Sequence, residues 1–382
     1  MSGVGGVYRS RLEVLAAGEV VEAHLAEWAA AHQPTARFGP WRRVYGKLRP
    51  NRSPWALLVY EAVGAPTVQV RLLEGAGPLG RVEVLSCTAD AALPGLPAVL
   101  AALDSPRVVR YHPGSRCTVH GGEGASARYV KVLAEDADDQ EEVRGRWAAS
   151  VSGALSFAVA EPHGWDPRSR SSWYGVVPGR PLTPHLLDPH GAGLARLVGM
   201  ALGQLATAPL KPNRVDDAAV QLARTRRGLA RAEAATPGLS AGLRTAADSL
   251  GRAHERLAPR PLVPVHGAAH LGQWLVDDEG RLGLVDFDRF ACGEPEFDLA
   301  TFLVELRDLS KEQGTDELED AVLGGFRAVA GEPDPERLAL YVLHKRVAKV
   351  ARTAASLRPD AEERAAPLLD ELRSPLAGLA AH

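Results

Sequence analysis

The sequence predicts an α+β fold in which a strand-rich first half precedes a mainly helical second half. Apolar runs separated by turn residues fill residues 41–177, a pattern typical of β-strands. Apolar residues at helical spacing dominate residues 190–258 and return after residue 299. A chain of 382 residues is long enough for two or three lobes with a large core.

Composition and charge exclude several classes of protein. Hydrophobic residues make up 46% and charged residues 24%, as in ordinary globular proteins, and the net charge of −3 does not favour nucleic-acid or anionic-membrane binding. The start lacks the apolar core of a signal peptide, and no apolar run approaches the roughly 20 residues that span a bilayer. Cys87, Cys117 and Cys292 are too dispersed for a metal motif. We therefore expect a cytoplasmic protein with neither a nucleic-acid nor a membrane partner.

The N-terminal residues predict a helix followed by a small antiparallel sheet. Residues 10–31 carry apolar side chains at roughly helical spacing, and the pattern ends before Pro34. Four strand-like runs separated by Gly and Pro turns follow, namely Val44–Leu48, Ala56–Val63, Val68–Leu73 and Arg81–Leu85. We expect residues 1–104 to form a cap subdomain, which either covers the next unit or recruits a substrate.

Residues 105–177 predict a second sheet of five strands with one helix. The strands are expected at Val108–Tyr111, Cys117–His120, Ala127–Leu133, Ser156–Ala160 and Ser172–Val177, with the helix at about 138–151. Lys131 lies among apolar residues inside the third strand, and a buried ammonium needs a partner. Glu141 or Glu142 of the helix could supply it. The alternative is that Lys131 extends to the surface of an edge strand.

The second half predicts helices with apolar stripes. The helical region 190–258 is interrupted at Thr236-Pro237-Gly238. Asp216 or Asp217 lies near the start of the helix that ends at this break. Later helices are expected at Leu299–Leu309, about 315–330 and 335–357, the last with Asp334 as its N-cap. Its cations are predicted to make one basic surface, either solvated or facing an acidic acceptor; they are His344, Lys345, Arg346, Lys349 and Arg352.

Residues 262–300 combine short apolar runs with polar clusters at their ends. Strands are expected at Leu262–Val265, Trp274–Val276 and Leu282–Val285. Their ends and the loops after them carry His266, His270, Gln273, Asp286 and Asp288. In an extended chain the two aspartates would face the same side, and two adjacent carboxylates with an amide suggest a Mg²⁺ site.

Three motifs resemble those of the aminoglycoside phosphotransferase/choline kinase-like family. The family pattern His-Gly-Asp-x-His-x-Gly-Asn, followed by an apolar-Asp-Phe/Trp segment and Gly-Asp-Pro-x-x-Asp-Leu-Ala, stands here as His266–Gln273, Val285–Asp288 and Gly293–Ala300. Arg110–Cys117 resembles the opening of the family's N-lobe, and Trp173–Leu182 resembles its hinge. Two departures are evident. Ala268 occupies the position of the catalytic Asp, and Gln273 replaces the metal-binding Asn, as in maltokinase-like relatives.

The resemblance implies a two-lobed protein-kinase-like fold with an N-terminal cap subdomain. Residues 105–177 would be the N-lobe and residues 178–382 the mainly helical C-lobe, with ATP between them. Lys131 would hold the phosphates and pair with Glu142, Gly114 would approach the phosphates, and the backbone near Val176 would meet the adenine. Asp286 and Gln273 would hold Mg²⁺, and His266 would support the catalytic loop by hydrogen bonding. Asp288 and His270 are the candidates for a substitute base.

Three functions are compatible with these residues. The first is a pseudokinase or regulatory partner that binds ATP, and a protein partner, but has lost transfer. The second is an active kinase that phosphorylates a hydroxyl of a small molecule (a sugar, an aminoglycoside or a choline-like compound) or of a biosynthetic precursor peptide. The third is a kinase inactivated by an Asp→Ala exchange. The paired Ala268-Ala269 and the exchange at Gln273 favour the first.

Overall fold

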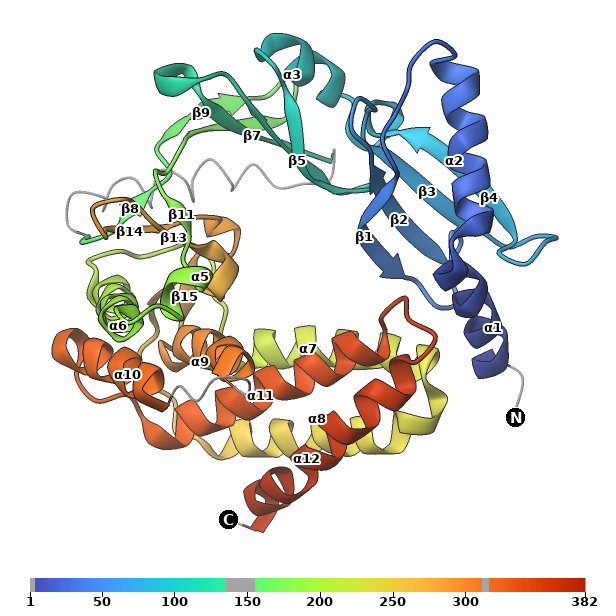
Figure 1. The fold of residues 1–382 in the computed structure, drawn as a ribbon. Helices are drawn as coiled ribbons and strands as arrows, with labels where there is room; N and C mark the ends of the chain where they lie inside the picture. Colours follow the sequence, from blue (N-terminus) through green and yellow to red (C-terminus); the bar gives the residue numbers. More distant parts are fainter. Residues whose placement is uncertain (1–3, 135–154, 311–315, 382) are drawn as a thin grey trace.

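The computed structural model describes residues 4–134, 155–310 and 316–381 (Figure 1). It begins with two helices packed on a four-stranded antiparallel sheet of order β1-β2-β3-β4, followed by a short helix. The elements are α1 (Val4–Ala17), α2 (Glu19–His32), β1 (Arg42–Leu48), β2 (Ala56–Glu61), β3 (Val68–Leu73), β4 (Arg81–Ser86) and α3 (Leu96–Ala102). The four predicted strands are confirmed. The single helix expected over residues 10–31 is divided at Gly18, whose φ of 85° is a conformation that glycine adopts without strain.

A five-stranded antiparallel sheet of order β5-β6-β7-β10-β9 follows. Its strands are β5 (Arg107–His112), β6 (Arg116–Gly121), β7 (Arg128–Leu133), β9 (Pro162–Asp166) and β10 (Ser171–Gly175). The helix expected at about 138–151 lies outside the described residues. Val59 of β2 shares a buried cluster with Val119 and Val130, so the first sheet is packed against the second.

The strand predicted at Ser156–Ala160 does not belong to this sheet. Its central residues form β8 (Ala158–Val159), which pairs in parallel with β14 (Leu282–Leu284) in the other half of the molecule. Phe157 is buried there, with its ring centroid 6.1 Å from that of Trp274, and Ser156 donates its backbone N–H to Gln204. An apolar run in a sequence indicates a buried strand, but it does not indicate which core the strand joins. Here the contact between Phe157 and Trp274 places the strand in the core of the helical lobe.

Two small sheets carry the polar segment that the sequence singled out. One has the order β11-β13-β14-β8, and the other pairs β12 with β15. Their remaining strands are β11 (Arg180–Pro181), β12 (Val263–Val265), β13 (Trp274–Val276) and β15 (Ala291–Gly293). The predicted strands before His266 and before Asp286 therefore lie in different sheets.

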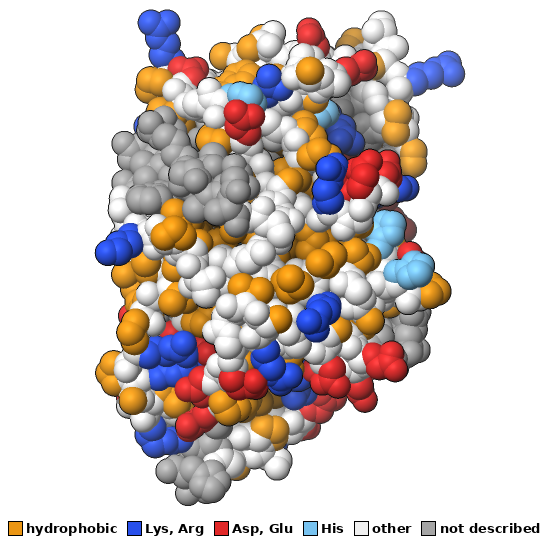
Figure 2. All heavy atoms as spheres, turned by 90° about the vertical axis from the view of Figure 1, so that its left-hand side faces the viewer, with side chains coloured by type: hydrophobic (Ala, Val, Ile, Leu, Met, Phe, Trp, Pro, Cys, Tyr) orange, Lys and Arg blue, Asp and Glu red, His pale blue; other side chains and the backbone are white. Residues whose placement is uncertain are grey.

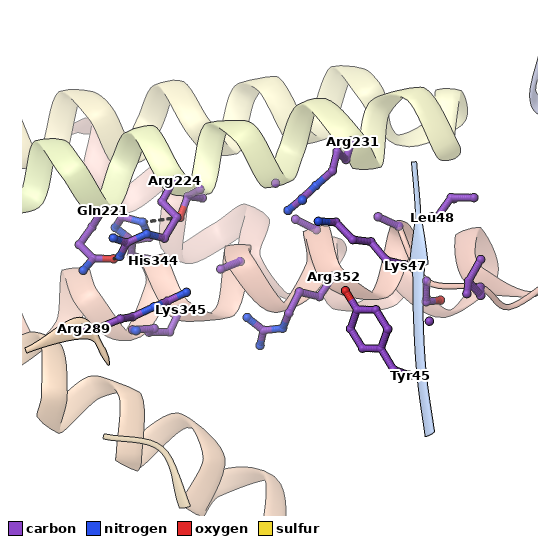
Figure 3. Close-up of a pocket in the computed structure, with 18 of the residues that line it drawn as sticks. Tyr45, Lys47, Leu48, Gln221, Arg224, Arg231, Arg289, His344, Lys345 and Arg352 are labelled. Atoms are coloured by element: carbon purple, nitrogen blue, oxygen red, sulfur yellow. Dashed lines mark hydrogen bonds between the residues drawn. The ribbon is translucent and has the colours of Figure 1, made fainter. Parts of the chain in front are cut away.

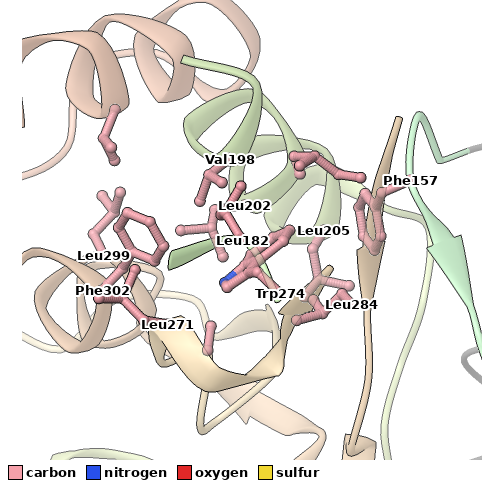
Figure 4. Packing of buried hydrophobic residues seen from close by; sticks show 14 of the residues in the cluster. Phe157, Leu182, Val198, Leu202, Leu205, Leu271, Trp274, Leu284, Leu299 and Phe302 are labelled. Carbon is pink, nitrogen blue, oxygen red and sulfur yellow. The ribbon is translucent and has the colours of Figure 1, made fainter. Parts of the chain in front are cut away.

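Helices make up the rest of the chain. They are α5 (Thr183–Leu186), α6 (Gly191–Thr207), α7 (Ala218–Ala235), α8 (Ser240–Arg256), α9 (Glu296–Ser310), α10 (Asp316–Ala330), α11 (Pro335–Ala354) and α12 (Ala361–Ala381). Trp274 is fully buried between side chains of α6 and α9, including Leu202 and Phe302 (Figure 4). A second core joins α7, α8, α11 and α12. The predicted N-cap at Asp334 is confirmed, since its side chain accepts from the N–H groups of Glu336 and Arg337. Of the two aspartates expected near the start of α7, Asp217 is the N-cap and accepts from the Val220 N–H.

The prediction of one basic surface on α11 is wrong, because the helix presents its cations in different directions. Arg346 pairs with Glu371 and Lys349 with Asp308, at 2.9 and 2.7 Å. Lys345 and Arg352, seven residues apart, line a cavity together with residues of α7 and β1. His344 is buried and hydrogen-bonded to Thr225.

The first sheet also touches the helical lobe directly. Leu357, just after α11, belongs to the buried cluster of the first sheet, and a Cβ on Gly46 of β1 would lie 2.4 Å from its Cδ1. The N-terminal sheet, the second sheet and the helical lobe therefore follow one another around a ring that closes where β1 faces α7 and α11 (Figure 1). Acidic and basic side chains are interspersed over the lower part of the face in Figure 2. Within the described ranges, no helix is long and apolar enough to cross a membrane.

The contact between α6 and α10 depends on glycine. A Cβ on Gly199 would lie 1.9 Å from the carbonyl oxygen of Val322, which is backbone and cannot give way. We expect Gly199→Ala to lower the free energy of unfolding by about 1–3 kcal/mol or more, measured by urea denaturation. Gly193→Ala is the matched control in the same helix. No atom lies within 4 Å of its added Cβ, so a gain of up to about 1 kcal/mol is expected. Equal effects of the two exchanges would contradict the packing argument.

Candidate active site

A network of opposite charges joins β7 to the segment after β14. The Lys131 ammonium donates to Asp286 Oδ1 at 2.7 Å and also to Asp288, and Arg116 of β6 donates to the other oxygen of Asp288. The side chains of Lys131 and Asp288 are 14% and 15% exposed, so these pairs are only weakly screened by water. Lys131 thus has carboxylate partners in the other lobe, and its predicted partner Glu142 lies outside the described residues.

The two aspartates reach Lys131 by a different backbone path from the one predicted. Asp286 has φ 69° and ψ 59°, a left-handed conformation, and Phe287–Arg289 forms a short 3₁₀ helix. The expectation of an extended chain that places Asp286 and Asp288 on the same side is therefore wrong, although both carboxylates do meet Lys131. A left-handed non-glycine residue costs about 1–3 kcal/mol, which surrounding interactions must offset. The contact with the Lys131 ammonium is one such interaction.

Electrostatics keep the Asp286 carboxylate ionised. Burial raises the pKa of Asp286, but the charge and hydrogen bond of Lys131 outweigh it and hold that pKa well below the ordinary value. A carboxyl group whose pKa is lower in the folded than in the unfolded state stabilises the fold at pH values above its unfolded-state pKa. This stabilisation is lost as the pH falls toward the folded-state pKa. The network therefore contributes to stability at neutral pH.

Gln273 and His270 border the same carboxylate. The Gln273 amide donates to Asp286 Oδ2 at 3.0 Å and to His270 Nε2 at 3.2 Å. Burial lowers the pKa of His270, which agrees with a neutral ring that accepts at Nε2. The amide oxygen and nitrogen of Gln273 exchange places by rotation about one bond, so the side chain can offer oxygen instead.

The oxygen donors suit a metal ion only together with another ligand. The described residues contain no group of three or more His, Cys, Asp or Glu side chains placed to hold a metal. Mg²⁺ in nucleotide sites is commonly held by one or two carboxylates, with phosphate oxygens and water completing the shell. Asp286, Asp288 and a rotated Gln273 amide fit that set. The site is therefore suited to a metal that arrives with phosphates.

Asp298 organises the loop that carries Ala268. It accepts the backbone N–H groups of His266 and Gly267 at 2.6 and 3.0 Å. Asp298 lies in the first turn of α9, which begins at Glu296, and its carboxylate faces the loop. Burial raises the pKa of Asp298 to about 6, against the opposing effect of the two amides.

His266 supports the same loop from inside the core. It is fully buried, and its Nε2–H donates to the Val285 carbonyl at 3.1 Å. A carbonyl only accepts, so the proton lies on Nε2, and burial lowers the pKa of His266 to about 4. A neutral, buried ring of this kind connects the loop to the strand before Asp286.

Ala268 leaves the position of the expected base without a carboxylate. Its carbonyl accepts the His270 backbone N–H at 2.7 Å, which places His270 next to it along the loop. Asp288, the other candidate base, has both carboxylate oxygens engaged by Lys131 and Arg116. The loop geometry therefore offers one uncharged imidazole and one fully paired carboxylate.

The remaining predicted site residues lie at the edges of the second sheet. Gly114 has φ 70°, as a tight turn requires, but its N–H donates to Asp90 Oδ2 at 2.7 Å. Val176 lies between β10 and β11, and its side chain is 41% exposed. Sequence reasoning assigned no role to Asp90 or Arg116. Arg116 lies within the family-like Arg110–Cys117 run, so that motif could have indicated it, whereas nothing in the sequence links Asp90 to Gly114.

Comparisons with known proteins identify the family and the fold. The model of the phosphotransferase enzyme family matches residues 122–341. The structure of amicoumacin kinase hAmiN in complex with AMP-PNP, Ca²⁺ and Ami is similar, with a TM-score of 0.59 and 15% identity over 75% of this chain and 95% of that one. Choline kinase LicA from Streptococcus pneumoniae has a TM-score of 0.52 and 13% identity over 72% and 96% of the two chains.

A GDP complex of aminoglycoside 2'-phosphotransferase-IIIa is similar to the same degree, with a TM-score of 0.52 and 14% identity over 75% and 99% of the two chains. The search of curated sequences finds no match. At such identities the similarity concerns the fold, and it confirms the predicted two-lobed, protein-kinase-like architecture.

The charge network generates a pH-dependent prediction. In Lys131→Met the carboxylates of Asp286 and Asp288 lose their shared cation and repel each other, so the pKa of Asp286 rises from its depressed value. We expect the free energy of unfolding to fall by about 1–3 kcal/mol at pH 7 and by clearly less near pH 4.5, where protonation of Asp286 in the variant relieves the repulsion.

The control is Lys349→Met, which breaks the exposed pair with Asp308. Its cost should stay within about 1 kcal/mol at both pH values. Denaturant unfolding at the two pH values measures both variants. A cost in Lys131→Met that does not change with pH would contradict the role given to the aspartates.

Proposed function

The chain belongs to the phosphotransferase enzyme family, and from this premise we propose that it binds ATP with Mg²⁺ but has lost most of its capacity for phosphoryl transfer. The nucleotide would lie between the second sheet and the segment 266–288. The observation that carries the proposal is the pairing of an intact set of phosphate-side charges with alanine at position 268.

The proposal that the chain binds a nucleotide rests on the charges of the side chains at the site and on their positions. The Lys131 ammonium donates to Asp286 at 2.7 Å and also to Asp288, so an incoming phosphate could bind the ammonium while the carboxylates turn to a metal ion. Mg²⁺ would supply charge neutralisation between the phosphate oxygens. Arg116, which holds Asp288, is a second cation within reach of the same region. The exposed backbone near Val176 would meet the base.

The loss of transfer rests on the acceptor side. A positioned base contributes about 10²–10⁴-fold to a transfer of this kind, and Ala268 has no group that accepts a proton. Asp288 is a poor replacement, because two cations hold both of its oxygens. Such a chain would act as a nucleotide-dependent binding or regulatory partner in the cytoplasm.

A second candidate, an active kinase, is favoured by one observation. His270 is next to Ala268 in the loop, and its lowered pKa leaves the imidazole unprotonated near neutral pH, as a general base must be. Its acceptor would be a hydroxyl of a small molecule or of a peptide. Under this candidate His270→Gln would abolish turnover, whereas under the first there is no turnover to abolish.

ATP with Mg²⁺ should raise the melting temperature of the protein, because a ligand that binds only the folded state stabilises it by mass action. Lys131→Ala and Asp286→Ala should remove the rise, and Lys349→Met should keep it. Differential scanning fluorimetry with a nucleotide titration measures the effect. A folded wild-type protein that shows no rise at millimolar ATP would refute nucleotide binding.

Restoring the missing carboxylate should restore chemistry. Ala268 is only partly buried, so Ala268→Asp can be accommodated without repacking the core. We expect the rate of ATP turnover to rise about 10²-fold or more over wild type, measured by ADP release. Ala268→Asn, which matches the size but accepts no proton, is the control. Wild-type turnover that already equals that of Ala268→Asp would show that a base is present and would favour the second candidate.

A further inference from the structure

A cavity of about 540 Å³ lies where the N-terminal sheet meets the helical lobe. Its walls come from β1, α7 and α11 and from Arg289, which ends the short helix after Asp286 (Figure 3). Six Lys and Arg side chains line it, namely Lys47, Arg224, Arg231, Arg289, Lys345 and Arg352, and none of the Asp and Glu residues that the structure describes does. A chain with a net charge of −3 has thus gathered cations around one space.

The cations form two tiers. Thr225 hydrogen-bonds His344, and a Cβ on Gly228 would lie 3.8 Å from that of Ala351, so α7 and α11 run parallel in this region. Arg224 and Arg231 are seven residues apart on α7, and so are Lys345 and Arg352 on α11. Two helical turns correspond to about 10.5 Å. The inner tier, defined as Arg224, Lys345 and Arg289, is therefore separated by about that distance from an outer tier of Arg231, Arg352 and Lys47.

Most of these cations lack partners. Within the described residues, the side chains of Lys47, Arg231, Arg289 and Arg352 make no hydrogen bond or ion pair. Lys345 lies 3.4 Å from the ring centroid of Phe297. Of the six cations, only Arg224 has an ion pair with another described residue, at 3.2 Å from the buried Asp216. Carboxylates outside the cavity offset part of the positive charge. Asp298 acts on Lys345, and Glu305 and Asp308 act on Arg352.

Like charges lie close together in the cavity. Burial and then the charge of Arg231 lower the pKa of Lys47. Figure 3 shows Lys47 and Arg231 pointing toward each other from β1 and α7, and Arg289 beside Lys345. Like charges held this close raise the free energy of the empty cavity, and an anion between them would lower it.

The inner tier adjoins the loop of Ala268. A Cβ on Gly267 would lie 2.5 Å from the Arg289 carbonyl oxygen, so the loop packs directly on Arg289. Lys345 acts electrostatically on Asp298, whose carboxylate holds the amides of His266 and Gly267. A ligand in the cavity would therefore have one end at the position where a kinase presents its acceptor.

We propose that this cavity binds a small organic molecule that carries two phosphate groups, one in each tier, and that this molecule occupies the acceptor side of the site. Its place as acceptor rests on the proposed function, but its binding does not. Arginine forks match phosphate oxygens in bidentate geometry, and the volume is that of ordinary small-molecule sites. A cationic acceptor would meet six like charges, and a neutral one would leave them unpaired.

The test is calorimetric titration of the full-length protein with fructose 1,6-bisphosphate, whose phosphates lie at opposite ends of a six-carbon chain. We expect binding that weakens as salt is raised. Fructose 6-phosphate should bind about tenfold or more weakly, because one tier stays unpaired, and fructose and choline should not bind.

Arg231→Gln and Arg289→Gln, at solvent-accessible positions of the outer and inner tiers, should each weaken binding about tenfold or more. Arg346→Gln, which removes the same charge from another side of α11, should leave binding unchanged.

Nucleotide binding is followed in the same samples. Arg231→Gln should keep the ATP-dependent rise in melting temperature, and Lys131→Ala should keep bisphosphate binding, so either proposal can fail alone. Four outcomes would overturn the cavity assignment: no binding of the bisphosphate at millimolar concentration, equal binding of fructose, equal losses in Arg346→Gln and the cavity variants, or loss of bisphosphate binding in Lys131→Ala. Preferential binding of a single-stranded oligonucleotide would overturn the small-molecule class.

Discussion

The contact between the Lys131 ammonium and the carboxylates of Asp286 and Asp288 is the constraint on which the site depends. It bridges the second sheet and the segment after β14, which are separated by 155 residues in the chain. Two carboxylates this close would repel each other without a cation between them, so the position of β7 relative to the helical lobe is tied to their ionisation. The left-handed backbone of Asp286 and the short helix after it belong to the same arrangement, because they aim both carboxylates at one ammonium.

The two groups of cations differ in whether their charge is compensated. Lys131 and Arg116 meet carboxylates of the chain itself, so their region is close to neutral before any ligand arrives. The cavity between β1, α7 and α11 instead contains cations that have few charged partners among the residues that the structure describes. A protein gains no stability from crowding like charges, and such crowding is therefore better explained by a ligand than by the fold. The N-terminal sheet acquires a role in this way, because Lys47 completes the outer tier.

Much of the fold was predictable because it is local. The strands of the first sheet, the strands β5, β6, β7 and β10 of the second, the break at Pro237 and the cap at Asp334 follow from turn chemistry and periodicity. Strand β9 was not predicted. The proximity of Lys131 and Asp286 could be predicted only from the family resemblance. The predictions that failed concerned contacts between distant parts of the chain or the conformation of the backbone. The segment around Phe157 joined the helical lobe through an aromatic contact, and Asp286 adopted a left-handed backbone. The outer tier needed β1 to meet α7 across 180 residues, which no sequence pattern encodes.

The short helix Phe287–Arg289 connects the two charged regions, so a ligand in one region would act on the other through it. Asp288 faces Lys131 and Arg116 on one side, and Arg289, the next residue, faces the cavity on the other. A phosphate that displaces Asp288 from Lys131 must move this helix or recruit a metal ion to replace the lost pairing. An anion that binds Arg289 restrains the same helix from the opposite side. Coupling of this kind is reciprocal by thermodynamic necessity, so each ligand changes the affinity for the other by the same factor. A chain with alanine at position 268 could thus report on two anionic ligands at once without transferring a phosphoryl group between them.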